Sequence, residues 1–265
     1  MPALPAFLRR SEILWALPVI ALHAMLIHHY FFFTDDAYIS FRYARNLVLG
    51  RGLVWNVGEY VEGYTNFLWT ILLAGGMKVG LDPHLLSGTL SILCSYLTLY
   101  VVYRTARVIF DASLGRKLAR LTGWFAVVIL VSNRSYNVWA SGGLETRLFT
   151  LLTALSLYFF FRKRSLHAGL SMSLATLTRP DGLLLSALLG LLIVAREWDQ
   201  QREFQRRFSR RQLLSRIIAQ AVRYATAALS IIGAFLIFRY LYYGQLLPNT
   251  YYAKVDASWP EMGLR

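Results

Sequence analysis

Long apolar runs separated by short polar segments dominate the sequence. They cover approximately residues 13–33, 67–81, 85–103, 121–139, 147–161, 165–178, 182–195 and 217–243. A helix of about 20 apolar residues is long enough to cross the hydrocarbon core of a bilayer. The pattern therefore predicts an all-α integral membrane protein whose 265 residues form a single transmembrane domain.

Eight runs would give eight crossings, but the placement of the basic residues disagrees with that number. Lys and Arg favour the cytoplasmic side of a membrane. If 67–81 lies in the interface instead of crossing, most of the 28 basic residues fall on the same side of the membrane as the N-terminus. Most of the 14 acidic residues then fall on the opposite side. Lys78 also suits an interfacial helix. We therefore expect about seven transmembrane helices, with the N-terminus cytoplasmic and the C-terminus outside.

This topology divides the loops into two kinds. The segment 34–82 becomes an extracytoplasmic first loop with juxtamembrane amphipathic helices, and 196–216 becomes a basic cytoplasmic loop, expected as a helix on the anionic leaflet. The runs 165–178 and 182–195 rise only about 21 Å each at 1.5 Å per residue, less than the roughly 30 Å of hydrocarbon. We expect them to form short spans or a shallow hairpin.

Composition adds two exclusions. The net charge of +14 would favour nucleic acid in a soluble protein, but here the chain is 56% hydrophobic and only 16% charged, and basic residues crowd the ends of apolar runs. No basic stripe interleaved with stacking aromatics is present, so we expect no nucleic-acid partner. The single cysteine, Cys94, lies inside an apolar run, so no intrachain disulfide and no Cys/His metal cluster are expected.

The first loop opens with an acidic pair at the membrane boundary. Thr34 is the expected N-cap of an amphipathic helix over 37–49, and Asp35-Asp36 follow it directly. Acidic residues in a first helical turn can have the sole role of stabilising the helix dipole, but a single acidic residue would suffice for that. Ionised carboxylates beside three phenylalanines are costly at this boundary, which favours a functional role. We expect Asp35 and Asp36 to be catalytic.

Polar residues gather in the other outward segments too, whereas the inner loops lack this mixture of acids, amides and tyrosines. Arg179 and Asp181 could simply pair with each other, and Arg42 and Arg45 could anchor to lipid headgroups. The alternative is a polar cavity on the outer face that binds substrate. The candidate substrate-binding residues are Arg42, Arg45, Glu62, Tyr64, Asn66, Glu145, Arg179, Asp181, Asn249, Tyr252 and Lys254.

Five motifs in order resemble a known family. They are 35–46 (DDAYISFRYARN), 61–69 (VEGYTNFLW), 143–146 (GLET), 179–182 (RPDG) and 247–254 (LPNTYYAK). Together they are similar to GT-C glycosyltransferases, most closely to the bacterial group of terminal arabinofuranosyltransferases of the cell wall. The resemblance implies a GT-C-like fold, a polyprenyl-phosphate sugar donor and a glycan or lipid acceptor. It also implies further C-terminal spans and an extracytoplasmic C-terminal domain, so we expect this chain to be truncated.

In that resemblance the catalytic acid falls on Asp35 or Asp36. We assign the general base to Asp35, with Asp36 orienting the acceptor or a metal, in an inverting single displacement. The cofactor stays unknown: a divalent cation would suit an acid and a phosphate, but no ligand set identifies a metal site. The expected location is the bacterial inner membrane, with the active site outside. Two alternatives stay open, a multi-span transporter or lipid flippase, and a non-catalytic fragment of such a transferase.

Overall fold

A computed structural model describes residues 10–204 and 210–255, and these form an all-helical structure without strands. Its helices are α1 (Arg10–His29), α2 (Ala37–Val48), α3 (Phe67–Lys78), α4 (Pro83–Ser132), α5 (Arg134–Val138), α6 (Thr146–Phe161), α7 (Ser165–Thr178), α8 (Gly182–Phe204), α9 (Arg210–Tyr243) and α10 (Asn249–Val255).

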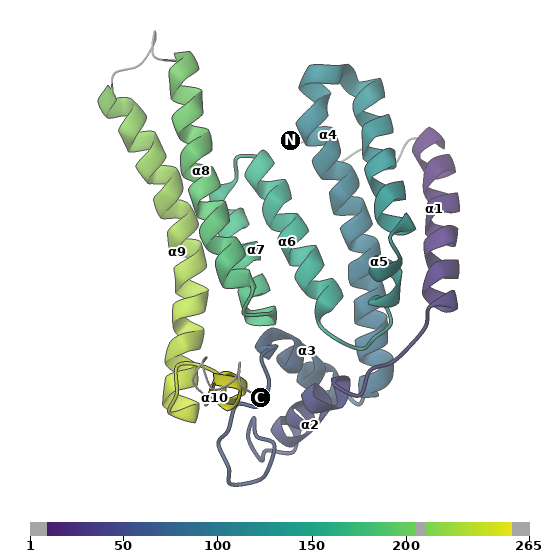
Figure 1. Ribbon diagram of the computed structural model, residues 1–265, viewed down its shortest axis with the longest axis vertical. Coiled ribbons are helices and arrows are strands. Elements are labelled where there is room, and N and C mark those ends of the chain that lie inside the picture. The colour runs from purple at the N-terminus through teal and green to yellow at the C-terminus, as the bar shows by residue number, and fades with distance from the viewer. Residues whose placement is uncertain (1–9, 205–209, 256–265) are drawn as a thin grey trace, which may run out of the picture.

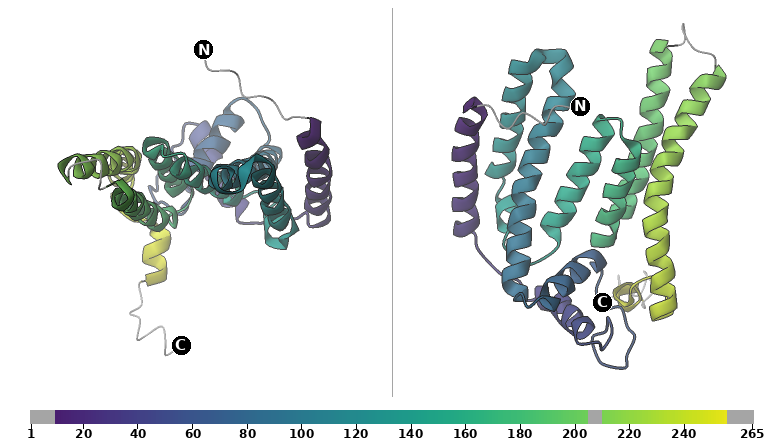
Figure 2. Two further views of the ribbon diagram at one scale, coloured as in Figure 1. Left: turned by 90° about the horizontal axis from the view of Figure 1, so that it is seen from above. Right: turned by 180° about the vertical axis from the view of Figure 1, so that it is seen from behind.

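The long helices form a bundle with two different ends. Helices α1, α4, α6, α7, α8 and α9 run alongside one another, whereas α2, α3 and α10 lie across one end, at the bottom of Figure 1. We call this the loop end, and the opposite end, which carries the bend of α4 and the α6–α7 turn, the basic end. The view from behind in Figure 2 shows the same separation.

Helix α4 is a helical hairpin. Its two arms meet at Gly115, whose φ of 74° and ψ of 161° break the helix, and a positive φ is accessible to glycine at little cost. The arms pack closely where Gly123 faces Tyr103, since a Cβ on Gly123 would lie 2.8 Å from the Tyr103 ring. Arg116 and Lys117 directly follow the bend and are exposed at the basic end.

The same close packing joins α7 to α9. A Cβ on Gly169 would lie 2.6 Å from the backbone oxygen of Tyr224. Inside a bilayer the hydrophobic effect does not drive helices together, because lipid is as apolar as the helices. Small residues such as glycine then favour association, since they let two helix backbones pack closely. Tyr224 itself is fixed because its hydroxyl donates to the backbone oxygen of Ser186 at 2.7 Å.

Within the described residues, two helices are long and apolar enough to cross a membrane by length and composition: Pro83–Ser132 and Leu214–Tyr243. Seven crossings remain a prediction. The placement of α3 agrees with the treatment of 67–81, because α3 packs against α2 at the loop end and does not run with the long helices.

Three details differ from the sequence-based expectations. Asp36, not Thr34, occupies the N-cap position of α2, because Thr34 is held outside the helix by a bond from its backbone nitrogen to Gly142 O at 3.3 Å. The run 121–139 is interrupted after Ser132, where Asn133 caps α5. The segment 196–216 is not a separate surface helix: α8 continues to Phe204 and α9 begins at Arg210.

Candidate active site

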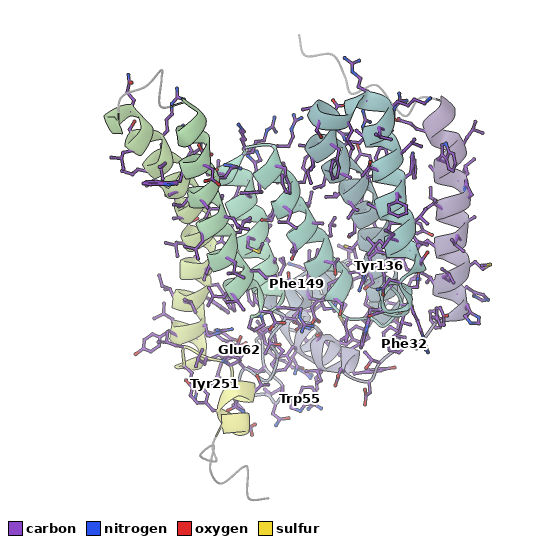
Figure 3. The ribbon with its side chains drawn as sticks, turned by 45° about the horizontal axis from the view of Figure 1, so that its top comes forward. Phe32, Trp55, Glu62, Tyr136, Phe149 and Tyr251 are labelled. Atoms are coloured by element: carbon purple, nitrogen blue, oxygen red, sulfur yellow. The ribbon has the colours of Figure 1, made fainter. Side chains whose placement is uncertain are left out.

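The predicted site residues gather at the loop end, but they form four separate groups. The acidic pair stands at the start of α2, and a polar cluster lies around Glu145. A buried ion pair joins Glu62 to α9, and a cavity collects arginines on α2. Figure 3 labels Glu62, Trp55 and Tyr251, which lie together at this end of the bundle.

The acidic pair is exposed and has no cationic partner among the residues that the structure describes. Asp36 has helical angles (φ −56°, ψ −25°) and its side chain makes no capping bond. The Oδ1 atom of Asp35 accepts from the backbone nitrogen of Asp36 at 3.0 Å and from the Thr34 hydroxyl at 3.3 Å. Neither carboxylate forms an ion pair with a described residue. Both carboxylates are therefore accessible to a ligand and are not held by a cation among the described residues.

Glu145 organises a largely buried cluster that links four segments of the chain. Its Oε2 accepts from Asn66 Nδ2 at 2.9 Å, and its Oε1 accepts from Arg179 Nη1 at 3.3 Å. Ser40 of α2 exchanges hydrogen bonds with Asn66 at 3.0 and 3.3 Å. Arg179 also contacts Asp181 through Nη2 at 3.1 Å. This Glu145 cluster confirms that Arg179 and Asp181 pair, but also joins them to a larger network.

The Glu145 cluster and the acidic pair are neighbours along α2. Ser40, which belongs to the cluster, follows Asp36 by one helical turn, so the two share a face of the helix. The bond between Thr34 and Gly142 ties the same stretch to the loop that carries Glu145. Arg179 is joined to this face through Glu145, Asn66 and Ser40.

Glu62 and Arg239 form a buried ion pair between the first loop and α9. Arg239 Nε lies 2.7 Å from Glu62 Oε2, and Nη2 donates to Oε1 at 3.1 Å. Both side chains are less than a tenth exposed. Nη1 of Arg239 donates to Leu246 O, and the Asn249 backbone nitrogen donates to Glu62 O, both at 3.0 Å. This Glu62 clamp fixes the first loop to the segment that leads into α10.

Burial raises the pKa of Glu62, and the charge and hydrogen bond of Arg239 oppose that rise. Burial also raises the pKa of two tyrosines beside the clamp. Burial raises the pKa of Tyr64, whose hydroxyl lies 3.2 Å from the Tyr243 hydroxyl. Burial also raises the pKa of Tyr43, whose hydroxyl donates to Val61 O at 2.9 Å. These tyrosines are neutral and hold the first loop in place.

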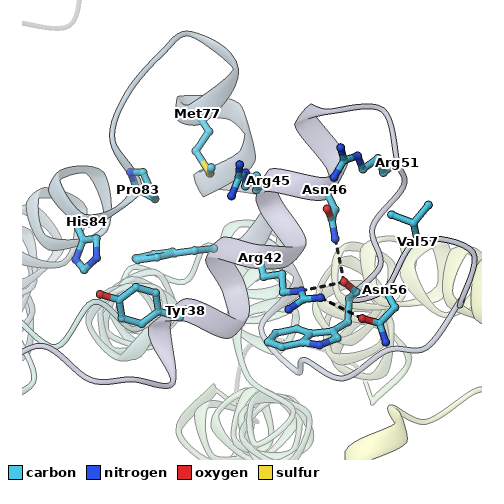
Figure 4. Close-up of a pocket in the computed structure, with 12 residues that line it drawn as sticks. Tyr38, Arg42, Arg45, Asn46, Arg51, Asn56, Val57, Met77, Pro83 and His84 are labelled. Carbon is cyan, nitrogen blue, oxygen red and sulfur yellow. Dashed lines mark hydrogen bonds between the residues drawn. The ribbon is translucent and has the colours of Figure 1, made fainter.

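Arg42 and Arg45 line a cavity of about 670 Å³ between α2, the end of α3 and the start of α4. Figure 4 shows Arg42 donating to Trp55 O at 3.0 Å and to Asn56 Oδ1 at 3.1 Å. Its guanidinium also lies 4.3 Å from the centre of the Trp55 ring. Neither the acidic pair nor Glu145 lines this cavity.

The C-terminal motif is only partly placed. Asn249 begins α10 and contributes its backbone nitrogen to the Glu62 clamp, whereas Tyr252 is exposed. The side chain of Lys254 lies outside the described residues. No three His, Cys, Asp or Glu side chains come together as a metal site in the part of the chain that the structure describes.

Sequence reasoning missed three buried polar groups. Arg239 completes the clamp, and His23 bridges Asn137 and Ser95 at 2.8 and 2.9 Å. Arg147 lies buried with its guanidinium 4.5 Å from the Tyr136 ring centre. Each is an ionisable residue inside or beside an apolar run, and that position alone is a signal of a specific partner.

Fold and site together define a helical bundle with candidate membrane helices and a polar site at one end. The chain is similar to the terminal beta-(1->2)-arabinofuranosyltransferase of Mycobacterium tuberculosis, with 31% identity over 246 residues. The match covers 84% of this chain and 35% of that protein, so the chain spans about a third of the relative's length. No protein-family profile and no solved structure matches the chain. This distant homology indicates a glycosyltransferase.

Proposed function

We propose that this chain carries the catalytic site of a GT-C-type membrane glycosyltransferase that moves a sugar from a polyprenyl-phosphate donor to an extracytoplasmic glycan or lipid acceptor. The observation that carries the proposal is the exposed, cation-free pair Asp35-Asp36 beside the Glu145 cluster. The relative's name favours an arabinofuranosyl or related pentosyl or hexosyl group as the cargo.

The proposed topology follows from the two ends of the bundle. The α4 bend and the α6–α7 turn carry Arg116, Lys117 and the basic run 162–164 at the basic end. Placing that end in the cytoplasm satisfies the preference of basic residues for the inner side. The loop end then faces outward, on a bacterial inner membrane crossed about seven times, and the acidic pair lies at the outer boundary.

In the proposed reaction an acceptor hydroxyl attacks the anomeric carbon of the donor sugar. The new C–O bond forms as the bond between the anomeric carbon and the phosphate oxygen breaks, so the configuration inverts. Asp35 takes the hydroxyl proton, Asp36 orients the acceptor, and polyprenyl phosphate leaves with the bonding electrons. General-base assistance of this kind contributes about 10²–10⁴-fold to the rate.

Developing charge on the leaving phosphate needs a cation, and Arg179 suits this role better than Arg42 or Arg45. Arg179 belongs to the cluster that shares a helical face with Asp36, and its side chain is 39% exposed. A guanidinium can bind two phosphate oxygens while Glu145 and Asp181 hold its orientation. Arg42 and Arg45 line a different cavity.

The test is sugar transfer from a polyprenyl-phosphate donor by purified Asp35→Asn and Asp36→Asn proteins in detergent or nanodiscs. Glu59→Gln is the matched control, because Glu59 is an exposed acid of the same loop whose carboxylate accepts only from Asn56 among the described residues. We expect the control to retain transfer and Asp35→Asn to lose it. Unimpaired transfer by both aspartate variants would rule out the catalytic assignment.

A further inference from the structure

The arginine cavity holds an excess of positive charge that the site around Asp36 does not use. Its lining includes Arg42, Arg45 and Arg51, and no Asp or Glu. The side chains of Arg45 and Arg51 are exposed and form no hydrogen bond or ion pair with any described residue. Three guanidinium groups around one space repel one another, and an anion in that space would relieve the repulsion.

Arg42 differs from the other two, because the protein fixes it. Its bonds to Trp55 O and Asn56 Oδ1 and its position over the Trp55 ring hold the guanidinium at the wall of the cavity. Asn46 is fixed as well, since its side-chain nitrogen donates to Val54 O at 2.8 Å. The cavity therefore has one preorganised cation and two adaptable ones, and Figure 4 draws hydrogen bonds to Arg42 but none to Arg45 or Arg51.

The cavity lies on a different face of α2 from the Glu145 cluster. Positions 38, 42 and 45 recur at the three- and four-residue spacing of one helical face, whereas Ser40 and Ala44 occupy the buried face toward α3. A ligand held by Arg45 is thus on the other side of α2 from the Glu145 cluster. The cavity is a second site, not an extension of the first.

The surroundings of the cavity are apolar and exposed. Val57 of its lining is 66% exposed, and Val79 and Leu85, next to the lining residues of α3 and α4, are 76% and 68% exposed. Tyr38 and Trp55 add exposed aromatic rings. Aromatic residues of this kind favour the headgroup level of a membrane. Cations inside an apolar border match an amphiphile whose head is anionic.

We propose that this cavity binds the phosphate of an anionic glycerophospholipid headgroup, with the acyl chains lying along the exposed apolar residues at its border. The bound lipid would fix the juxtamembrane helices α2 and α3 against the outer leaflet. The inference needs the loop end to lie at the membrane surface, but it does not need the chain to catalyse sugar transfer.

The experiment compares binding of a phosphatidylglycerol and a phosphatidylcholine with identical acyl chains to the purified full chain in neutral detergent. The site variant is Arg45→Ala/Arg51→Ala, and the matched control is Arg116→Ala/Lys117→Ala, which removes the same charge at the basic end. We expect the preference for phosphatidylglycerol to fall about tenfold in the site variant, as for the loss of one or two solvent-screened charged hydrogen bonds. The control should keep the preference.

Two results would overturn the proposal. Equal losses in the site and control variants would show only general attraction of a basic protein for anionic lipid. Displacement of phosphatidylglycerol by equimolar or less polyprenyl phosphate would assign the cavity to the donor. The Asp35→Asn protein should keep the lipid preference even where it has lost transfer, so failure of this proposal and failure of the catalytic one are distinguishable.

Discussion

The loop end carries two kinds of carboxylate in contrasting surroundings. Asp35 and Asp36 are exposed and pair with no cation in the described part of the chain, whereas Glu62 and Glu145 are buried and each contacts an arginine. All four residues lie in polar segments between apolar runs, and the sequence predicted catalysis for Asp35 and Asp36 but substrate binding for Glu62 and Glu145. The structure separates them by burial and by partner.

The difference teaches which acids are available for chemistry. A buried carboxylate paired with a guanidinium is held in one position, and removing its partner is costly. Such a group orients the loops around it. An exposed carboxylate without a cation can exchange a proton with a ligand. The contrast predicts opposite outcomes when each kind is neutralised, for activity and for stability.

The largest expected effect concerns the acidic pair. Asp35→Asn should lower kcat for sugar transfer by about 10²–10⁴-fold, and Asp35→Asn/Asp36→Asn should lower it little further, because residues that act as a unit are not additive. The free energy of unfolding should change by no more than about 0.5 kcal/mol, since both side chains are exposed and Asp36 makes no capping bond. Steady-state transfer assays measure kcat, and thermal unfolding in the same detergent measures the change in stability. A large loss of stability would show that Asp35 and Asp36 have a structural role like that of Glu62 and Glu145.

The second prediction concerns the Glu62 clamp. Arg239→Met or Glu62→Met leaves one buried charge without its partner and should cost about 3–5 kcal/mol of stability. The double variant Glu62→Met/Arg239→Met should cost much less than the sum, because no charge stays buried. Chemical unfolding in micelles, followed by tryptophan fluorescence, tests this. Additive losses in the double variant would show that the two side chains act independently.

The third prediction concerns Glu145, whose cluster stands next to the acidic pair. Glu145→Gln keeps an acceptor for Asn66 but removes the charge facing Arg179. We expect a stability loss of about 1–3 kcal/mol, less than for the clamp, because Asp181 still holds Arg179. Thr70→Val, which removes only a 3.1 Å bond to Asn66, is the milder control. A Glu145→Gln protein as unstable as Arg239→Met would contradict this ranking.

Much of the fold was accessible from the sequence because apolar periodicity and charge act locally. The helix expected over 37–49 is α2 at Ala37–Val48, and the run 165–178 is α7 at Ser165–Thr178. The runs 85–103 and 121–139 were expected as two consecutive spans, but not that both helices extend through the basic segment between them and meet at Gly115. The ends of α8 and α9 were also misjudged, because charged residues continue a helix as readily as apolar ones.

The site was less accessible, because its partners are far apart in the chain. The acidic pair could be singled out from its boundary position, but Glu62 meets Arg239 across 177 residues. Arg239 sits in an apolar run, where it looks like an isolated cation until the first loop folds onto it. Likewise Arg42 and Arg45 were correctly grouped, but only the packing of α2 shows that they face a cavity separate from Asp36. Helical spacing predicts which residues share a face of a helix, but only tertiary packing determines which other residues that face contacts.

The smallest expected effect is a pH dependence of the clamp. Burial raises the pKa of Glu62 above its reference of 4.5, so the folded state binds a proton more tightly than the unfolded state. The free energy of unfolding contributed by Glu62 should therefore fall as the pH rises from about 4.5 through the raised pKa. Glu62→Gln cannot titrate and should flatten that part of the profile. Arg239→Met removes the charge that opposes the shift, so its profile should fall further and over a wider pH range. Thermal midpoints measured from pH 4 to 8 compare the three proteins, and a wild-type midpoint that rises through this window relative to Glu62→Gln would show that the pair with Arg239, not burial, governs this carboxyl group.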